Sequence, residues 1–319
     1  MKNMKNVWLI GAGEMASDYF RVLHYLACKT TVIGRGEESA KKFSGKFSIP
    51  VHEGGINCFL NLPRELPDAA IVSVGVEALA ETATSLIKYG VKRILLEKPG
   101  SLNYRDICDL NELAKENAAE VFIAYNRRMY ASVIEARKLI KEDGGVLSMN
   151  FEFTEWGHII SPLKKGPGIK EAWLLGNSTH VIDLAFYLGG NPVELTTFTG
   201  GTLDWHPTSA IFVGAGRTEH NVLFSYNANW MSPGRWGVEI LTENYRFILR
   251  PLEALQFVKK GSVAVESHEI NDHWDKMFKP GLYEQTVNFL NGNVEELCSI
   301  DSQVSIWPFY AKMANYSLL

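Results

Sequence analysis

The sequence predicts two domains: an α/β N-terminal Rossmann domain with a doubly wound parallel sheet, and an α+β C-terminal domain with an open, mostly antiparallel sheet. A glycine-rich turn follows an apolar strand at the start of the chain, and strands and helices then alternate. Further along, strand-like runs follow one another with few helices between them. Because 319 residues exceed the usual size of one core, we expect domains at 1–122 and 123–319.

The first strand and turn have the pattern of a dinucleotide site. The apolar run 7–10 leads into Gly-Ala-Gly-Glu-Met-Ala at 11–16, and an amphipathic segment follows. Gly11 permits a tight turn, Gly13 lets the backbone approach a pyrophosphate, and Ala16 lets the helix pack closely. The helix N-terminus offers N–H groups and a positive dipole end to the phosphates. The turn's predicted cofactor-binding residues are Gly11, Gly13, Glu14 and Met15.

The end of the second predicted strand favours NADP. The strand 30–33 is followed by Gly34 and Arg35, where NAD sites usually carry an acid for the ribose 2′-hydroxyl. A guanidinium pairs with a 2′-phosphate in a fork and stacks on adenine. The alternative is a solvated Arg35 with Glu37 or Glu38 holding the ribose of NAD, so NAD remains possible.

Two more strand ends are expected beside the cofactor. The buried run 69–74 ends at Val74 and Gly75, and the run 93–96 leads straight into Glu97 and Lys98. In a doubly wound sheet the carboxyl ends of the strands line the ligand crevice. The alternative for Glu97 and Lys98 is an exposed turn with a surface ion pair.

Other elements follow from periodicity. The first half has predicted helices at 77–89 and 104–117 and a strand at 121–124, whereas 49–67 shows little regular pattern. The second half has predicted helices at 131–142, 178–188, 283–290 and 302–318, the last with Pro308 as a kink or early-turn residue. Its strand-like runs are 146–156, 193–199, 209–213, 222–227, 236–241 and 245–249.

Composition excludes several function classes. The chain is 46% hydrophobic and 21% charged with net charge −4, which gives no general attraction for nucleic acid or an anionic membrane. The four cysteines are far apart, so we expect no metal site, no disulfide framework and a cytoplasmic location. The first apolar run is too short for a signal sequence, and no stretch approaches the roughly 20 apolar residues that cross a bilayer.

Four motifs in order resemble one family. They are the 11–16 turn, Glu97-Lys98-Pro99, Asn126-Arg127-Arg128 and Asn177-Ser178-Thr179-His180-Val181-Ile182-Asp183. Together they are similar to the glucose-fructose oxidoreductase/inositol dehydrogenase/rhizopine catabolism family, written Gfo/Idh/MocA, over essentially the full length. The resemblance implies hydride transfer between a nicotinamide and a sugar, inositol or related carbinol.

The resemblance also implies roles for single residues. Lys98 matches the family's active-site lysine and His180 its histidine, so both are implied to be catalytic; an imidazole exchanges protons near neutral pH. Asn177 and Asp183, three residues to either side of His180, share one helix face with it and are implied to contact the substrate. Asn126 is implied to bind the nicotinamide ribose or carboxamide, whereas Arg127 and Arg128 are implied to be structural.

One departure affects the proton relay. The family pattern is Asp-x-Gly-x-His-x-x-Asp, and this chain has Gly176 at the acid and Ser178 at the glycine. Asn177 is a candidate to occupy that space, binding a substrate hydroxyl without exchanging protons. Taken alone, His180 on so apolar a helix has the alternative of a hydrogen-bonded core histidine.

Trp156 and Trp173 are candidates to stack on a sugar ring, and their alternative is ordinary core packing. The predicted function is an NADP-dependent oxidoreductase acting on a sugar or sugar derivative, nucleotide-linked sugars included. Its alternatives are a non-catalytic NAD(P)-dependent sensor and a dehydrogenase of an imine or amino acid. Since an open sheet usually needs its outer face covered, we expect a homodimer or homotetramer.

Overall fold

A computed structural model describes residues 4–317. The chain divides into two compact units. Of the described residues, the first unit runs to Ala124 and takes in Met277–Val304, and the second consists of Tyr125–Lys276 with residues 305–317. The boundary expected at 122/123 falls close to the first change of unit, and it did not include the return of 277–304 to the first unit.

The first unit is built on a seven-stranded sheet in the order β15-β6-β5-β4-β1-β2-β3. Strands β1 to β6 are all parallel, and β15 joins β6 antiparallel. The predicted doubly wound parallel sheet is therefore confirmed. The bounds are β1 (Asn6–Ile10), β2 (Lys29–Ile33), β3 (Val51–His52), β4 (Ala69–Val72), β5 (Arg93–Leu96), β6 (Glu120–Ile123) and β15 (Cys298–Ser299).

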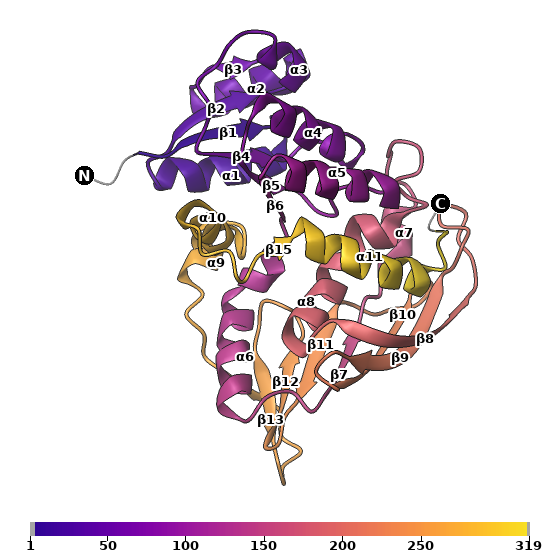
Figure 1. The fold of residues 1–319 in the computed structure, drawn as a ribbon. Coiled ribbons are helices and arrows are strands. Elements are labelled where there is room, and N and C mark those ends of the chain that lie inside the picture. Colours follow the sequence, from indigo (N-terminus) through magenta and orange to yellow (C-terminus); the bar gives the residue numbers. More distant parts are fainter. Residues whose placement is uncertain (1–3, 318–319) are drawn as a thin grey trace. The chain divides into compact units, whose positions relative to one another are not determined.

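Helices of the first unit form two groups (Figure 1). Helix α1 packs on α10, and Phe20 of α1 contacts Phe43 and Phe47 of α2. Helix α4 packs against both α3 and α5. The bounds are α1 (Glu14–Tyr25), α2 (Glu37–Phe47), α3 (Gly55–Leu60), α4 (Leu79–Tyr89), α5 (Tyr104–Glu116) and α10 (Leu282–Asn291).

The second unit is built on an eight-stranded sheet in the order β14-β13-β12-β11-β7-β10-β9-β8. Within this sheet, as far as residues 4–317 show, only the β7–β10 pair is parallel, so the predicted mostly antiparallel sheet is confirmed. The bounds are β7 (Ser148–Glu152), β8 (Pro192–Gly200), β9 (Ile211–Thr218), β10 (Leu223–Asn229), β11 (Gly237–Leu241), β12 (Tyr245–Leu249), β13 (Gln256–Lys259) and β14 (Glu266–Ser267).

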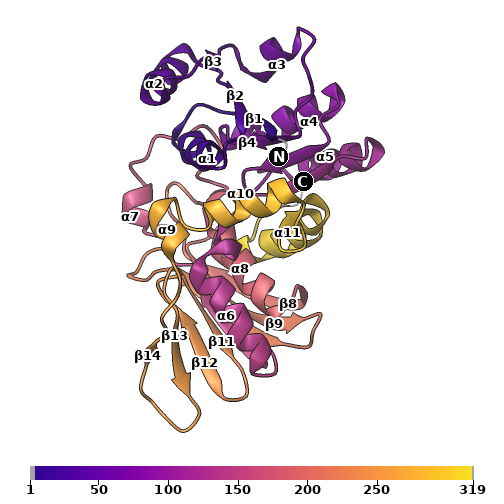
Figure 2. The same cartoon turned by 90° about the vertical axis from the view of Figure 1, so that its left-hand side faces the viewer.

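Helices cover one face of this sheet (Figures 1 and 2). Helix α8 (Thr179–Gly189) packs on β7 and β11, and α6 (Ala131–Glu142) packs on β12. Phe224 and Tyr226 alternate with exposed residues along β10, and Phe186 of α8 lies edge-on to Phe224. Phe198 on β8 is 70% exposed, so apolar surface remains on this sheet. Two further helices are short: α7 (Gly157–Ile160) and α9 (His273–Met277).

The last helix, α11 (Ile300–Ala314), contains Pro308 well inside it rather than in its first turn. The predicted helix over 302–318 thus begins two residues late, and it runs past the observed end at Ala314, because the described residues 315–317 are not helical. Within residues 4–317 no helix is both long and apolar enough to pass through a membrane.

Candidate active site

The glycine turn of the first unit packs tightly on one side and is open on the other. Gly11 has φ of +127°, and a Cβ added to it would lie 2.4 Å from the carbonyl oxygen of Ser73 after β4. Only glycine suits that backbone and that contact. Gly13 caps α1 in an extended conformation, and a Cβ there would meet nothing within 4 Å. Open space therefore lies in front of the N-terminus of α1.

A hollow of about 420 Å³ opens at this turn, at the carboxyl ends of β1, β2 and β4. Five predicted cofactor-binding residues line it: Gly11, Gly13, Arg35, Val74 and Gly75. Gly34 lies next to it, where a Cβ would crowd Ala12 and Val51, and Glu14 and Met15 form the first turn of α1. Sequence reasoning missed Ile56 and Asn57 of α3, which also line the hollow, because 49–67 lacked a readable period.

These residues fit a dinucleotide. The twelve-residue helix α1 directs its N-terminal N–H groups and dipole at the hollow, and Gly13 leaves room for a pyrophosphate. Arg35 is 77% exposed at the tip of β2, with its guanidinium 3.8 Å from the carboxylate of Glu77. Dinucleotide sites for NAD usually carry an acid at this strand tip, and this chain has a cation there.

Glu97 and Lys98 follow β5 directly and are both half-buried. The Tyr19 hydroxyl of α1 donates a hydrogen bond of 2.9 Å to Glu97 Oε1. Burial raises the pKa of Glu97, while the Lys98 ammonium and the Tyr19 hydrogen bond oppose that rise. The Lys98–Pro99 peptide bond is cis, and Gln303 donates a hydrogen bond of 3.1 Å to the Pro99 carbonyl. The turn that carries Lys98 is thus held from α1 and from α11.

The second unit has a hollow of about 390 Å³ that contains three predicted substrate residues. Trp156, Trp173 and Asn177 line it together with Arg127, Glu155 and Trp236. Asn177 lies in a π-helical turn, Leu174–Ser178, which leads into α8. Such turns occur frequently at functional sites because they change the direction of one side chain within a helix.

Glu155 is the residue of this hollow that sequence reasoning missed. It follows β7 and is buried, and its carboxylate accepts hydrogen bonds of 3.0 and 3.1 Å from Asn177 Nδ2 and of 2.7 Å from Ser178 Oγ. The available signal was an acid at the end of the strand-like run 146–156, directly before Trp156.

His180 and Asp183 lie on α8 in different surroundings. His180 is 7% exposed, with Tyr125 edge-on at 5.9 Å and Trp236 at 6.3 Å between ring centroids. Asp183 is buried and accepts hydrogen bonds from Arg128 at 2.8 and 2.5 Å. Burial raises the pKa of Asp183, and Arg128 opposes the rise. The roles implied for these two residues therefore remain predictions, with Asp183 engaged by a cation.

The structure also bears on Asn126 and on metal-ligating side chains. Asn126 is buried in the 3₁₀ turn Asn126–Met129 after β6. Among residues 4–317, no three His, Cys, Asp or Glu side chains are grouped as a metal site requires.

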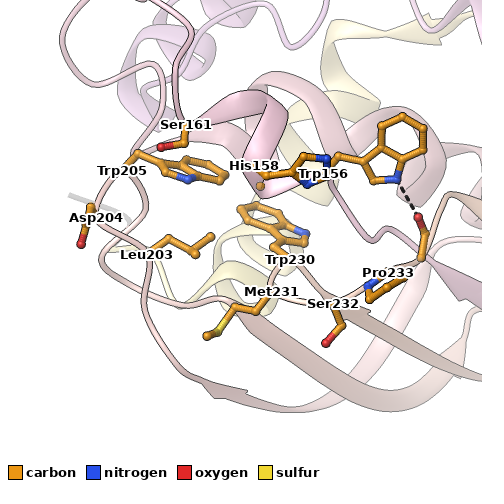
Figure 3. Close-up of a pocket in the computed structure, with 12 residues that line it drawn as sticks. Trp156, His158, Ser161, Leu203, Asp204, Trp205, Trp230, Met231, Ser232 and Pro233 are labelled. Carbon is orange, nitrogen blue, oxygen red and sulfur yellow. Dashed lines mark hydrogen bonds between the residues drawn. The ribbon is translucent and has the colours of Figure 1, made fainter.

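Another hollow of the second unit, of about 690 Å³, shares Trp156 with the hollow of about 390 Å³ (Figure 3). Trp156 is 57% exposed, yet its indole N–H donates a hydrogen bond of 2.8 Å to the Gly234 carbonyl. Trp205 and Trp230 stack with ring centroids 5.7 Å apart on the other side of the hollow. An exposed indole is therefore held in one orientation between two hollows.

Fold and glycine turn together are those of a Rossmann-type dinucleotide-binding protein with a second, α+β unit. Residues 5–125 match the family model described as "Oxidoreductase family, NAD-binding Rossmann fold", the model of the Gfo/Idh/MocA family. This match confirms the predicted family resemblance over residues 5–125.

Known proteins extend the comparison. An uncharacterized oxidoreductase, C115.03, of Schizosaccharomyces pombe is 27% identical over 145 residues, which are 43% of this chain and 39% of that protein's length. Levoglucosan dehydrogenase in complex with NADH and L-sorbose superposes with a TM-score of 0.78 at 18% identity, over 99% of this chain and 96% of that one. UDP-N-acetylglucosamine 3-dehydrogenase from Acidithiobacillus ferrooxidans has a TM-score of 0.76 at 13% identity, over 99% and 98% of the two chains. The structural likenesses show that the fold is shared along the chain.

Proposed function

We propose that this protein is an NADP-dependent oxidoreductase that interconverts a hydroxyl and a keto carbon of a sugar or sugar derivative. The observation that carries the proposal is the position of Lys98 at the carboxyl end of β5. That strand neighbours β4, whose end lines the dinucleotide hollow within the same unit. A proton-exchanging group is thus on the same sheet edge as the cofactor cradle.

The reaction needs one hydride acceptor or donor and one group for the proton. A bound nicotinamide takes or supplies the hydride. During oxidation the hydroxyl proton leaves the substrate oxygen, and Lys98 or His180 receives it as a general base. During reduction the Lys98 ammonium donates to the carbonyl oxygen, which becomes the hydroxyl.

The second unit supports a carbohydrate as substrate. Its smaller hollow combines three indoles, those of Trp156, Trp173 and Trp236, with the polar side chain of Asn177. Apolar ring faces with a few placed polar groups suit a sugar, which has C–H faces and a rim of hydroxyls. Two proteins of the same fold are named as dehydrogenases of levoglucosan and of a nucleotide sugar, so both free and nucleotide-linked sugars belong in the test.

The NADP preference is part of this proposal and rests on Arg35. The guanidinium follows β2 where an NAD site usually carries an acid, and it lines the dinucleotide hollow.

Assembly as a dimer or tetramer rests on exposed apolar side chains such as Phe198 on the second sheet. Sedimentation that gives a stable monomer would reject the assembly.

A second candidate function is a non-catalytic sensor that binds NADP. Gly176 favours it, because the family's acid is missing from the helix that carries His180. The two functions differ in turnover: a sensor binds NADPH tightly and leaves nicotinamide absorbance unchanged with every substrate.

The decisive experiment follows nicotinamide absorbance with NADPH and NADH against sugars, keto-sugars, nucleotide sugars, imines and amino acids. Lys98→Ala serves as the test variant and Lys92→Ala, an exposed lysine of the same unit, as the matched control. We expect NADPH turnover of a carbohydrate that falls about 100- to 10,000-fold in Lys98→Ala only. Tight NADPH binding without turnover on the whole panel would favour the sensor.

A further inference from the structure

A carboxylate reaches the π-helical turn from outside the helix. The helix that carries His180 has Gly176 where the family pattern has an acid. Glu155, which follows β7, instead brings its carboxylate to Asn177 and Ser178 of that turn. The carboxylate at this turn therefore comes from a residue more than twenty positions before Gly176 in the chain.

The segment that carries Glu155 is held rigidly. The indole N–H of Trp230 donates a hydrogen bond of 3.1 Å to the Phe153 carbonyl. The backbone N–H of Asn229 donates one of 3.2 Å to Thr154 Oγ1. Both anchors come from the end of β10, the parallel neighbour of β7, so the position of Glu155 is set by the sheet.

Glu155 determines which end of the Asn177 amide faces the hollow. An ionised carboxylate can only accept hydrogen bonds, so the NH₂ group of Asn177 must face it. Both carboxylate oxygens of Glu155 are within 3.1 Å of Asn177 Nδ2, and Ser178 Oγ donates to Oε1 as well. The opposite end of the amide is Oδ1, a hydrogen-bond acceptor on a residue that lines the hollow.

We propose that Glu155 is a positioning residue that fixes the Asn177 amide so that Oδ1 accepts a hydrogen bond from one hydroxyl of the substrate. The inference rests on the carbohydrate function proposed above and adds a specificity rule to it. The site selects a hydroxyl donor at that position, and Glu155 itself exchanges no proton with the substrate.

The test compares Glu155→Gln with Glu253→Gln on the sugar that the wild type turns over and on its monodeoxy analogues. Glu253 is an exposed carboxylate that lines the same hollow, so its variant changes the charge without the contact to Asn177. A charge-assisted hydrogen bond is worth about 1.5–3 kcal/mol, which corresponds to roughly 10- to 100-fold. We expect Glu155→Gln to lose about 10- to 100-fold in kcat/KM for the parent sugar, mainly through KM.

The specificity is measured with the deoxy analogue that lacks the hydroxyl proposed to bind Asn177 Oδ1. The wild type should reject it strongly, because Asn177 Oδ1 would be left without its donor. In Glu155→Gln the new amide can also donate a hydrogen bond, so the Asn177 amide is free to flip. The ratio of kcat/KM between the parent sugar and the deoxy analogue should then shrink by about tenfold, whereas Glu253→Gln should keep the wild-type ratio. A purely structural role would lower the rates for all sugars equally and leave the ratio unchanged.

Calorimetric binding of the same sugars to the NADPH complex separates the outcomes. If the wild type binds and turns over a sugar but Glu155→Gln keeps the wild-type ratio between the parent sugar and its deoxy analogue, the inference is overturned and the proposed function stands. Wild-type binding of no sugar at all would overturn both. Glu155→Asp keeps a carboxylate and should restore part of the ratio, which a folding defect would not do; thermal melting checks that each variant is folded.

Discussion

The hydroxyl of Tyr19 donates a hydrogen bond of 2.9 Å to Oε1 of Glu97 and so joins α1 to the turn that carries Lys98. Tyr19 is fully buried, and Gln285 Oε1 of α10 lies 3.3 Å from the same hydroxyl oxygen. The helix whose N-terminus opens on the dinucleotide hollow is therefore joined to the turn that carries Lys98 by a hydrogen bond from the buried Tyr19.

Glu97→Gln should stabilise the fold at neutral pH while weakening activity. Because burial raises the pKa of Glu97, the folded state of the wild type is most stable, as far as this group is concerned, when Glu97 is protonated at low pH. Its free energy of unfolding falls as the pH rises through that raised pKa. A glutamine stays neutral, so the melting temperature of the variant should exceed that of the wild type at pH 8. The difference should shrink towards pH 4. Exposed Glu116→Gln is the control, and a Glu97→Gln advantage that grows on acidification contradicts the argument.

Gly11→Ala and Gly13→Ala should fail in different ways. The alanine at 11 meets the Ser73 carbonyl at positive φ, so the free energy of unfolding should fall by about 2–4 kcal/mol. The alanine at 13 has space and ordinary backbone angles, so it should cost less than about 1 kcal/mol. Its methyl group stands where the pyrophosphate approaches, and the Kd for NADPH should rise roughly tenfold or more. Denaturant melts and cofactor titration of both variants check this, and equal effects would refute the open cradle.

Arg35→Ala should change the cofactor preference. Loss of the guanidinium removes charge-assisted hydrogen bonds to a 2′-phosphate, so KM for NADPH should rise about 10- to 100-fold. KM for NADH should stay within about threefold. Lys41→Ala is the control, since Lys41 is exposed nearby and pairs with Glu37. Equal losses with both cofactors would point to a general role for Arg35 and against NADP selection.

Asp183→Asn should act on stability rather than on substrate affinity. Removal of one partner from the buried pair with Arg128 leaves an uncompensated cation and should cost about 3–5 kcal/mol. Arg128→Met should cost a similar amount, and the double variant should recover part of the loss. Chemical denaturation measures this, whereas an unchanged stability with a raised KM would support the substrate role implied by the family resemblance.

Trp156→Ala should raise KM for the sugar about 3- to 10-fold, because an oriented ring face is lost from the rim of the hollow. Trp156→Phe should keep most of the affinity. Stability should change by less than about 1 kcal/mol, since the side chain is largely exposed. Met231→Ala, exposed in the neighbouring hollow, is the control; a KM unaffected by Trp156→Ala would remove the stacking role.

Some segments were predictable to the residue, whereas the predicted strands 146–156 and 209–213 are observed at 148–152 and 211–218. Helix α6 and strands β5 and β12 have the predicted bounds, because α6 has an apolar period and the two strands are short apolar runs. The two-residue strand β3 and the six-residue helix α3 were missed, since they are too short to express any period. Because α3 was not predicted, Ile56 and Asn57 were not included in the predicted cofactor site.

The sequence by itself determined the two sheet types, the glycine turn and the positions of Lys98 and Arg35, because these depend on local period and on neighbours within one strand-turn-helix unit. Only the tertiary structure decided the partners of buried polar groups. Glu155 meets Asn177, Tyr19 meets Glu97, and Arg128 meets Asp183. A buried donor or acceptor must find a partner wherever the folded chain supplies one, and distance along the sequence does not reveal where that is.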